Sequence, residues 1–227
     1  MKELICAFDV NETLLDLKVL DPWFDLYFGK KEFRQIWFKN ILHTSLVLNA
    51  TDRYQEFKII GATTLESLAK QFNIDLSDPM KTEFQNIMAT LPPHPDVEIS
   101  LHQLKKSGYR LFALSNSSQQ SVTELLNRAG LLSHFEECLS TDSVKKFKPD
   151  LAPYKYLAEK AQSEPNNIWL VAAHAWDTTG AQKAGLKSAL VLREGHGYNK
   201  LFSVPTVQGL DLPAVAQFII QKDKLII

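Results

Sequence analysis

Short apolar runs alternate with amphipathic segments through most of the chain, and this alternation limits the fold more than any other feature. Apolar runs typical of buried strands occur at residues 4–8, 110–114, 137–140, 168–172 and 188–192. Helical patterns cover residues 100–107, 117–128, 153–162, 178–184 and 213–221. Strands that alternate with helices form parallel sheets covered by helices on both faces. We therefore predict an α/β fold with a doubly wound, Rossmann-like parallel sheet.

The segment after the first predicted strand has a different character. Residues 16–91 show helical periodicity, as in Phe33, Trp37 and Ile41, and contain no convincing strand. Thr51-Asp52 is a predicted N-cap between helices of this segment, and Pro92-Pro93 ends the pattern. We predict a helical cap at 16–91, inserted into a core made of residues 1–15 and 92–227. An insertion of this kind can close a site as a lid.

Charge and hydropathy exclude several classes of protein. The 227 residues include 25 Lys and Arg against 26 Asp and Glu, so no basic face for nucleic acid is expected. No apolar stretch approaches the ~20 residues of a membrane span, and no signal-peptide pattern begins the chain. Cys6 and Cys138 lie in apolar runs and are predicted to be buried free thiols. We expect a cytoplasmic protein that binds neither nucleic acid nor membrane.

Polar side chains at or near the ends of predicted strands form one candidate set. Its members outside the cap are Asp9, Ser115, Asn116, Lys148, Tyr154, His174 and Asp177, and Arg34 in the cap joins them. Open α/β sheets place their ligand sites at the carboxyl ends of the strands. An Asp at a strand end often only caps the next turn. The combination nevertheless favours Asp9 as a catalytic nucleophile.

Four short motifs resemble those of the haloacid dehalogenase superfamily in order and spacing. Asp9-Val-Asn-Glu-Thr13 resembles the first motif, and Leu114-Ser115-Asn116 resembles the second. Lys148-Pro149-Asp150 followed by Tyr154 resembles the third motif. Val171-Ala-Ala-His174-Ala-Trp176-Asp177 resembles the fourth motif.

Within that superfamily, the chain looks most like the L-2-haloacid dehalogenases, whose cap carries a halide-binding Arg in the context seen at Phe33-Arg34-Gln35. The resemblance implies a hydrolase that displaces halide from short (S)-2-haloalkanoic acids and gives 2-hydroxy acids. It further implies a covalent ester on Asp9 and no metal or other cofactor. The expected partners are the small 2-haloacid substrate and the halide product. A homodimer through the cap helices is compatible with this reading, although no residue establishes it.

The chemistry assigns a role to each candidate. A buried carboxylate stays ionised only beside a cation, for which Lys148 is the candidate. Lys148 and Ser115, with backbone N–H groups after Asp9, suit the substrate carboxylate, and Arg34 with Asn116 suits the departing halide. Asp177, with His174 or Lys148, is expected to activate the water that hydrolyses the ester. The supporting catalytic residues are Thr13 and Tyr154. The expected substrate contacts are Asn11, Gln35, Phe38, Phe57 and Trp176.

Some of these residues have a structural alternative. Thr13 would also serve as a hydrogen-bonding turn residue, and Arg34 as a solvated helix residue. Tyr154 and the cap aromatics would also serve as core. These alternatives remain open at the level of the sequence.

Departures from the family pattern narrow the function. Asn11 occupies the position where phosphatases of the superfamily carry a general acid, and Ala173 occupies that of a magnesium-binding acidic residue. The dehalogenases typically have Tyr at the position of Asn11, Gly at that of Glu12 and an amide at that of His174. The His174 ring can act as a base near neutral pH. The alternatives are a phosphatase of small phosphate esters with an atypical site, and a non-catalytic pocket protein.

Overall fold

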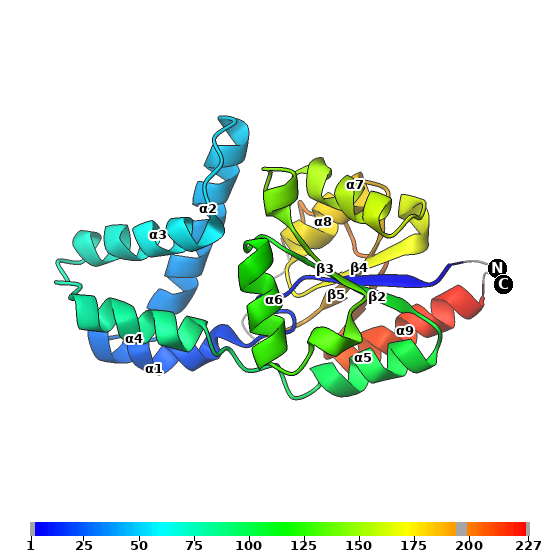
Figure 1. Ribbon diagram of the computed structural model, residues 1–227, viewed down its shortest axis with the longest axis horizontal. Helices are drawn as coiled ribbons and strands as arrows, with labels where there is room; N and C mark the ends of the chain where they lie inside the picture. Colours follow the sequence, from blue (N-terminus) through cyan, green and yellow to red (C-terminus); the bar gives the residue numbers. More distant parts are fainter. Residues whose placement is uncertain (1–2, 194–198, 226–227) are drawn as a thin grey trace. The chain divides into compact units, whose positions relative to one another are not determined.

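A parallel sheet forms the centre of the larger part of the molecule. The computed structural model describes residues 3–193 and 199–225, and within these residues the strands are ordered β3-β2-β1-β4-β5-β6, all parallel (Figure 1). Their bounds are β1 Ile5–Phe8, β2 Arg110–Ser115, β3 Glu137–Ser140, β4 Ile168–Ala172, β5 Lys187–Val191 and β6 Val207–Gly209. The predicted parallel sheet is confirmed.

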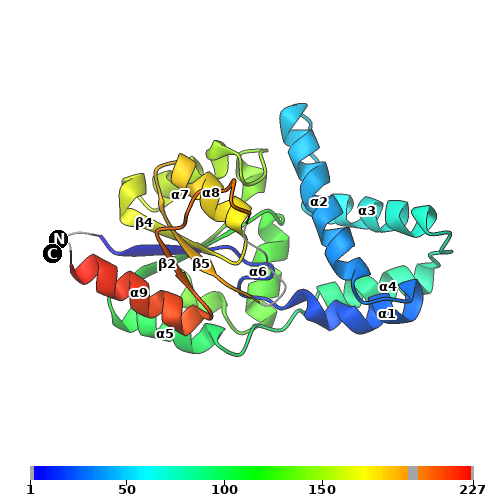
Figure 2. The ribbon, with the colours of Figure 1, turned by 180° about the vertical axis from the view of Figure 1, so that it is seen from behind.

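Helices cover both faces of this sheet. They are α5 (Val97–Lys106), α6 (Gln119–Arg128), α7 (Leu151–Lys160), α8 (Ala175–Lys183) and α9 (Leu212–Lys224), with short 3-10 turns at Leu132–His134, Thr141–Ser143 and Pro165–Asn167. Ile5 and Ala7 of β1 share a buried cluster with α7 and α8. Strand side chains alternate between faces, so Cys6 and Phe8 point to the opposite face. Helices α5 and α9 pack side by side in both views (Figures 1 and 2).

The chain divides into two compact units. One comprises Met1–Leu15 and Pro93–Ile227, and the other, here called the helical unit, comprises Asp16–Pro92. The helical unit contains a 3-10 turn at Leu17–Leu20 and helices α1 (Asp21–Phe28), α2 (Phe33–Ala50), α3 (Phe57–Gln71) and α4 (Asp78–Met88). No strand occurs between residues 16 and 92, all of which the structure describes.

The helical unit has an aromatic core of its own. The ring of Phe84 in α4 lies 4.9 Å from that of Trp23 in α1 and 5.0 Å from that of Trp37 in α2, measured between centroids. Both contacts have the edge-on geometry that adds roughly 0.5–1.5 kcal/mol to the burial of each aromatic pair. The Trp37 indole also donates a 3.0 Å hydrogen bond to the Gly61 carbonyl of α3. The four helices are therefore joined through one cluster.

Several element boundaries differ from the prediction. Thr51 ends α2 by donating its hydroxyl to the Val47 carbonyl at 2.8 Å, so the N-cap predicted at Thr51-Asp52 is wrong and α3 begins at Phe57. Helix α8 begins at Ala175 rather than at Thr178, which places Asp177 in its first turn. Strand β6 was not predicted, because Val207-Gln208-Gly209 has no apolar run.

Two expectations about the environment can be compared with the structure. Cys6 and Cys138 are free and buried, as predicted. Among residues 3–193 and 199–225, every helix is too short or too polar to cross a membrane.

Candidate active site

The candidate nucleophile lies at the centre of the sheet. Asp9 directly follows β1, which pairs with β2 on one side and β4 on the other. Its backbone N–H donates to the Val171 carbonyl of β4 at 3.0 Å, which extends the strand pairing by one residue. The carboxyl ends of adjacent parallel strands meet at one edge, so residues after β2 and β4 can converge on Asp9.

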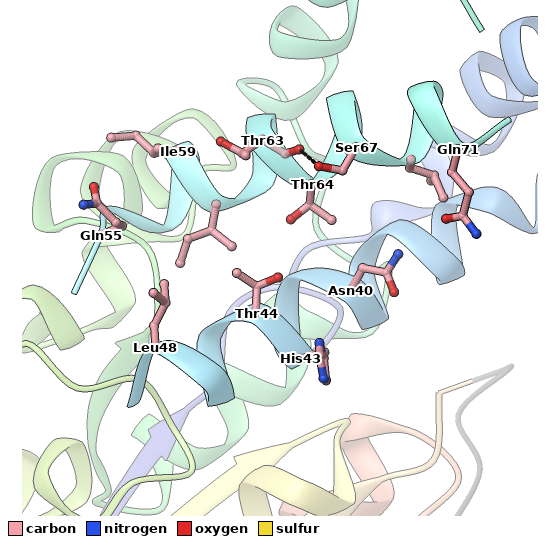
Figure 3. Close-up of a pocket in the computed structure, with 12 residues that line it drawn as sticks. Asn40, His43, Thr44, Leu48, Gln55, Ile59, Thr63, Thr64, Ser67 and Gln71 are labelled. Atoms are coloured by element: carbon pink, nitrogen blue, oxygen red, sulfur yellow. Dashed lines mark hydrogen bonds between the residues drawn. The ribbon is translucent and has the colours of Figure 1, made fainter. Parts of the chain in front are cut away.

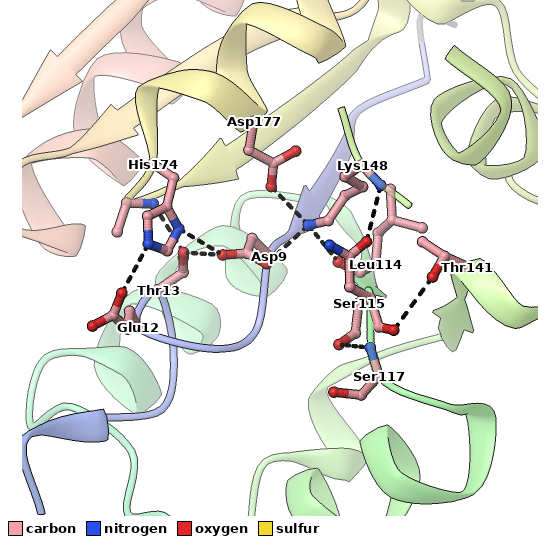
Figure 4. Close-up of polar contacts among 12 residues, drawn as sticks. Asp9, Glu12, Thr13, Leu114, Ser115, Ser117, Thr141, Lys148, His174 and Asp177 are labelled. Carbon is pink, nitrogen blue, oxygen red and sulfur yellow. Dashed lines mark hydrogen bonds and ion pairs between the residues drawn. The ribbon is translucent and has the colours of Figure 1, made fainter. Parts of the chain in front are cut away.

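Lys148 joins two of the predicted carboxylates (Figure 4). Its ammonium donates to Asp9 Oδ1 at 2.8 Å, to Asp177 Oδ2 at 2.7 Å and to the Leu114 carbonyl at 3.0 Å. Burial opposes the charge on Lys148, but Asp177 and Asp9 outweigh it and raise the pKa of Lys148. Burial likewise acts against the charge on Asp9, yet Lys148 and His174 hold the pKa of this carboxyl well below its usual range. Asp9 is therefore an ionised, nearly buried carboxylate.

Asp177 is the most enclosed carboxylate of the group. It is 0% exposed, with Lys148 on Oδ2 and the Tyr154 hydroxyl donating to Oδ1 at 2.5 Å. Burial raises the pKa of Asp177, and Asp9 adds to the rise while Lys148 opposes it. Burial and the neighbouring Asp177 raise the pKa of Tyr154, so the phenol stays a donor. Tyr154 belongs to the core cluster as well as to the site.

Thr13 and the motif after β2 hold these groups in place. The Thr13 hydroxyl donates to Asp9 Oδ2 at 2.7 Å and accepts from the Ala173 N–H at 2.8 Å, which ties the turn after β1 to the end of β4. Asn116 Oδ1 accepts the Lys148 N–H at 2.9 Å, while the Ser115 hydroxyl accepts the Ser117 N–H at 3.1 Å. Asn116 therefore positions the backbone of the central lysine.

His174 lies on the other side of Asp9 and has a partner that the sequence did not reveal. Its Nε2 is 2.9 Å from Glu12 Oε2, and its Nδ1 is 3.5 Å from Asp9 Oδ2 (Figure 4). Burial lowers the pKa of this imidazole, but Asp9 and Glu12 outweigh burial and raise it to about 9. Glu12 replaces the glycine typical of dehalogenases, and that departure was the only available signal of its role.

Two further predicted contacts lie beside this group. The Trp176 ring stacks on His174, with centroids 5.3 Å apart and planes inclined by 27°. Trp176 Nε1 and Asn11 Oδ1 are buried atoms without a hydrogen-bond partner among the described residues. The Asn11 amide oxygen, in the turn after Asp9, and the Trp176 indole N–H, in α8, are thus available to hydrogen-bond a bound molecule.

The remaining predicted residues belong to the helical unit. Arg34 is 4% exposed, and its Nε donates to Asp21 Oδ1 at 2.5 Å, so the alternative of a solvated helix residue is wrong. Phe38 is buried, Phe57 half-buried and Gln35 exposed. These four residues come from α2 and α3.

A separate hollow of about 460 Å³ lies between α2 and α3 (Figure 3). Its lining is mostly amide and hydroxyl side chains, such as Asn40, Thr44 and Gln71, together with the side chain of His43. None of the predicted site residues lines it, and it contains no carboxylate or lysine. It lacks the charged groups that the expected chemistry needs.

The residues around Asp9 do not fit a divalent metal ion. The Lys148 ammonium occupies the position between Asp9 and Asp177, and Ala173 offers no ligand where phosphatases of the superfamily have an acidic residue. Within the described residues, no cluster of His, Cys, Asp and Glu is arranged to hold a metal.

Comparison with known proteins places this geometry in a family. The model of haloacid dehalogenase-like hydrolases matches residues 24–191. The chain belongs to the haloacid dehalogenase-like hydrolase family. It is 28% identical to the (S)-2-haloacid dehalogenase of Pseudomonas sp. (strain YL), over 93% of this chain and 92% of that protein.

Solved structures of the family share the fold over almost the whole chain. The L-2-haloacid dehalogenase RSc1362 superimposes with a TM-score of 0.91 at 24% identity, covering 96% of this chain and 99% of that one. The L-2-haloacid dehalogenase of Xanthobacter autotrophicus with chloropropionic acid covalently bound gives a TM-score of 0.86 at 19% identity, covering 96% and 98%. At sequence identities this low, the structural similarity shows the fold of the chain and nothing more.

Proposed function

We propose that the protein hydrolyses short (S)-2-haloalkanoic acids to 2-hydroxy acids through a covalent ester on Asp9, without a metal ion. The observation that carries the proposal is the Lys148 ammonium, 2.8 Å from Asp9 and 2.7 Å from Asp177. A lysine at this point keeps the nucleophile ionised, and Ala173 lacks the carboxylate with which phosphatases of the superfamily bind magnesium. The similarity to (S)-2-haloacid dehalogenases supports the same substrate class.

The first step is a displacement at carbon. An oxygen of Asp9 attacks C2 of the substrate, the carbon–halogen bond breaks with its electron pair on the halide, and C2 is inverted. Arg34 and Asn116 are assigned to the departing halide, and Ser115 with Lys148 to the substrate carboxylate. Asn11, Gln35, Phe38, Phe57 and Trp176 are assigned to the substrate's remaining surface.

The second step hydrolyses the ester. Water adds to the Asp9 carbonyl carbon, and Asp177, with His174 or Lys148, is assigned to its activation. The ester's bond to the substrate oxygen breaks, which releases the 2-hydroxy acid and restores the carboxylate. Thr13 and Tyr154 hold the nucleophile and Asp177 in place through their hydrogen bonds.

The helical unit has a role in the same proposal. We assign it the supply of Arg34 and the role of a lid. A cytoplasmic location and a homodimer through the helices of this unit remain predictions.

Halide release tests the proposal directly. Protein incubated with (S)-2-chloropropionate or a haloacetate, in the presence of a chelator, is expected to release halide and the matching hydroxy acid. Asp9→Asn should abolish both products, whereas the matched surface variant Asp78→Asn, at a side chain 96% exposed, should not. No halide from any haloacid would refute the substrate class, and magnesium-dependent release of phosphate from small esters would favour the phosphatase.

A further inference from the structure

Two carboxylates, those of Glu12 and Asp9, lie on either side of the His174 imidazole. The dehalogenase pattern has glycine and an amide at the positions of Glu12 and His174, so it lacks this arrangement. Glu12 Oε2 lies 2.9 Å from one ring nitrogen of His174, and Asp9 Oδ2 lies 3.5 Å from the other. The side chains of all three are at most 11% exposed. A ring held by a carboxylate on one nitrogen presents its second nitrogen in a defined direction. Here that direction is the proposed nucleophile.

The backbone of Glu12 adopts a left-handed conformation. Its φ is +62°, in the left-handed region that disfavours residues other than glycine. The turn is closed by the Glu12 N–H, which donates to the Leu15 carbonyl at 2.8 Å, and by the Leu14 N–H, which donates to the Val10 carbonyl at 2.9 Å. Four other non-glycine residues share this conformation, namely Asp52, Asn73, Lys145 and Gln162, so the function of Glu12 is inferred from its contact with His174.

Of the three groups assigned to the activation of the water, His174 is the best placed to accept its proton. Asp177 is 0% exposed, and its oxygens already accept from Lys148 and Tyr154. Lys148 is held as a cation between two carboxylates, and a protonated amine cannot accept a proton. His174 has the ring nitrogen close to the carboxyl group that a water would attack.

We propose that His174 is the general base that hydrolyses the ester on Asp9, and that Glu12 is the positioning residue that sets its tautomer. This inference rests on the proposed function, because it concerns the second step of that reaction. In the neutral ring, Glu12 retains a proton on Nε2 and leaves the lone pair on Nδ1. The Nδ1 lone pair then faces the ester.

Formation of the ester itself prepares the base. In the free protein, Asp9 and Glu12 keep the imidazole protonated, since they raise its pKa to about 9. Alkylation removes the charge of Asp9, so the pKa of His174 falls and the ring releases a proton to solvent. The same ring therefore steadies the nucleophile first and becomes a base afterwards.

The protons and bonds balance over the cycle. Neutral His174 takes one proton of the attacking water, and the oxygen forms a bond to the Asp9 carbonyl carbon. Collapse of this intermediate breaks the bond to the substrate oxygen, which takes the second proton of the water and leaves as the 2-hydroxy acid. Asp9 is again a carboxylate, and His174 is again an imidazolium.

The ring's electrical surroundings come from several elements. Asp9 and Glu12 lie on the segment after β1, and the pair Lys148 and Asp177 acts on the ring through Asp9. Two further titratable or charged groups contact the backbone of the same turn, namely His94 at the Glu12 carbonyl and Arg193 at the Thr13 carbonyl. Of these groups, only Asp9 changes charge when the ester forms.

A single-turnover experiment with His174→Asn separates the two steps. After mixing with (S)-2-chloropropionate, the variant is expected to release chloride in a burst of about one equivalent. Release of 2-hydroxypropionate should then be slower than in the unchanged protein by about 10²-fold or more, as for loss of a general base. Mass spectrometry of the quenched variant should find the adduct on the peptide that contains Asp9.

Glu12 variants test the positioning role. Glu12→Gln removes a charge that raises the pKa of His174, so the pH inflection of the hydrolysis step should move to lower pH. Glu12→Asp keeps the charge and should restore the inflection toward that of the unchanged protein. A merely structural residue would alter the amount of active protein without moving the inflection.

The outcomes distinguish this inference from the proposed function. Hydrolysis by His174→Asn at an unchanged rate, or an unmoved inflection in Glu12→Gln, would overturn the inference while the chloride burst upholds the ester. No chloride from the unchanged protein would instead overturn the proposed function. If His174→Asn loses the burst through misfolding, the inflection in Glu12→Gln and Glu12→Asp decides.

Discussion

At the scale of single residues, Asp9 lies beside cations of different kinds. Lys148 contacts both Asp9 and Asp177, and its ammonium keeps its proton while either carboxylate is charged. One ring nitrogen of His174 faces Asp9 and the other faces Glu12. The pKa of the imidazole depends on the charge of Asp9, which is lost when the ester forms. Lys148 is therefore a permanent cation, whereas His174 is a responsive one, which loses its charge when the ester forms.

Replacing the permanent cation should damage the fold as well as activity. Lys148→Met leaves Asp9 and Asp177 buried without their shared cation, and breaking such a pair costs about 3–5 kcal/mol. The free energy of unfolding in urea should fall by about this amount near neutral pH, and halide release should be lost. Because protonation relieves the uncompensated carboxylates, the loss should shrink as the pH is lowered.

The exposed Lys183 of α8 provides the matched control. Lys183→Met should change the free energy of unfolding by no more than about 0.5 kcal/mol. An equal loss in both variants would contradict the assignment of Lys148 as a buried structural cation.

How far single residues could be predicted depended on whether their position in the chain revealed their neighbours. Asp9, Ser115 and Asp177 lie at or shortly after the ends of apolar strands, so their convergence at one sheet edge could be inferred. Glu12 could not be inferred, because its contact with His174 depends on a left-handed turn and joins residues 162 positions apart. Its only trace in the sequence was an acidic residue where the family has glycine.

At the scale of elements, the packing of α8 against α7 and the loop before it brings Tyr154 to Asp177. Gly180 makes this approach possible. A Cβ atom there would lie 2.6 Å from the Tyr154 hydroxyl and 2.9 Å from the Pro149 carbonyl. Because Gly180 has no side chain, helix α8, which carries Asp177, can pack closely against the segment that carries Lys148 and Pro149.

Gly180→Ala should consequently be destabilising, although alanine favours helices. Forcing a methyl group into such a contact typically costs about 1–3 kcal/mol. The control is Gly61→Ala in α3, where a Cβ would meet Ile41 and Trp37 at 3.7 Å, an ordinary contact. The control should gain up to about 1 kcal/mol from helix propensity. Urea unfolding of the pair should give opposite signs, and a neutral Gly180→Ala would contradict the tight seating of α8.

Elements with a strong pattern were predicted well, and their ends less well. Strands β1, β2 and β4 have continuous apolar runs because both faces of the sheet are covered. Strand β6 has only three residues at the sheet edge, with one exposed, so it leaves no such run. The start of α3 was misplaced because Thr51 serves the end of α2, and both uses of a threonine look alike in a sequence.

At the scale of the whole molecule, the charges around Asp9 couple the stability of the fold to pH. The aromatic core of the helical unit contains Trp23, Phe24 and Phe84, which have no titrating group. The other unit carries the ionised network of Asp9, His174 and Lys148. Its stability should therefore depend on pH where these groups titrate.

The responsive cation sets the direction of this dependence on the alkaline side. The pKa of His174 rises from 6.5 to about 9 on folding, so its contribution is fully present below pH 6.5 and is lost as the pH rises through 9. A rise of this size corresponds to about 3 kcal/mol. His174→Asn lacks the titrating ring and should lack this part of the pH dependence.

Urea unfolding of the unchanged protein and of His174→Asn, compared from pH 6 to about pH 9.5, measures the effect. The difference in unfolding free energy should change by about 3 kcal/mol against the unchanged protein over that range, mostly above pH 6.5. Gln71→Asn, at an exposed residue of α3 that has no titrating group, provides the control and should run parallel to the unchanged protein throughout. Parallel curves for His174→Asn as well would mean that folding leaves the pKa of the ring at 6.5, so that the ring is neutral above this pH and ester formation has no proton to release from it.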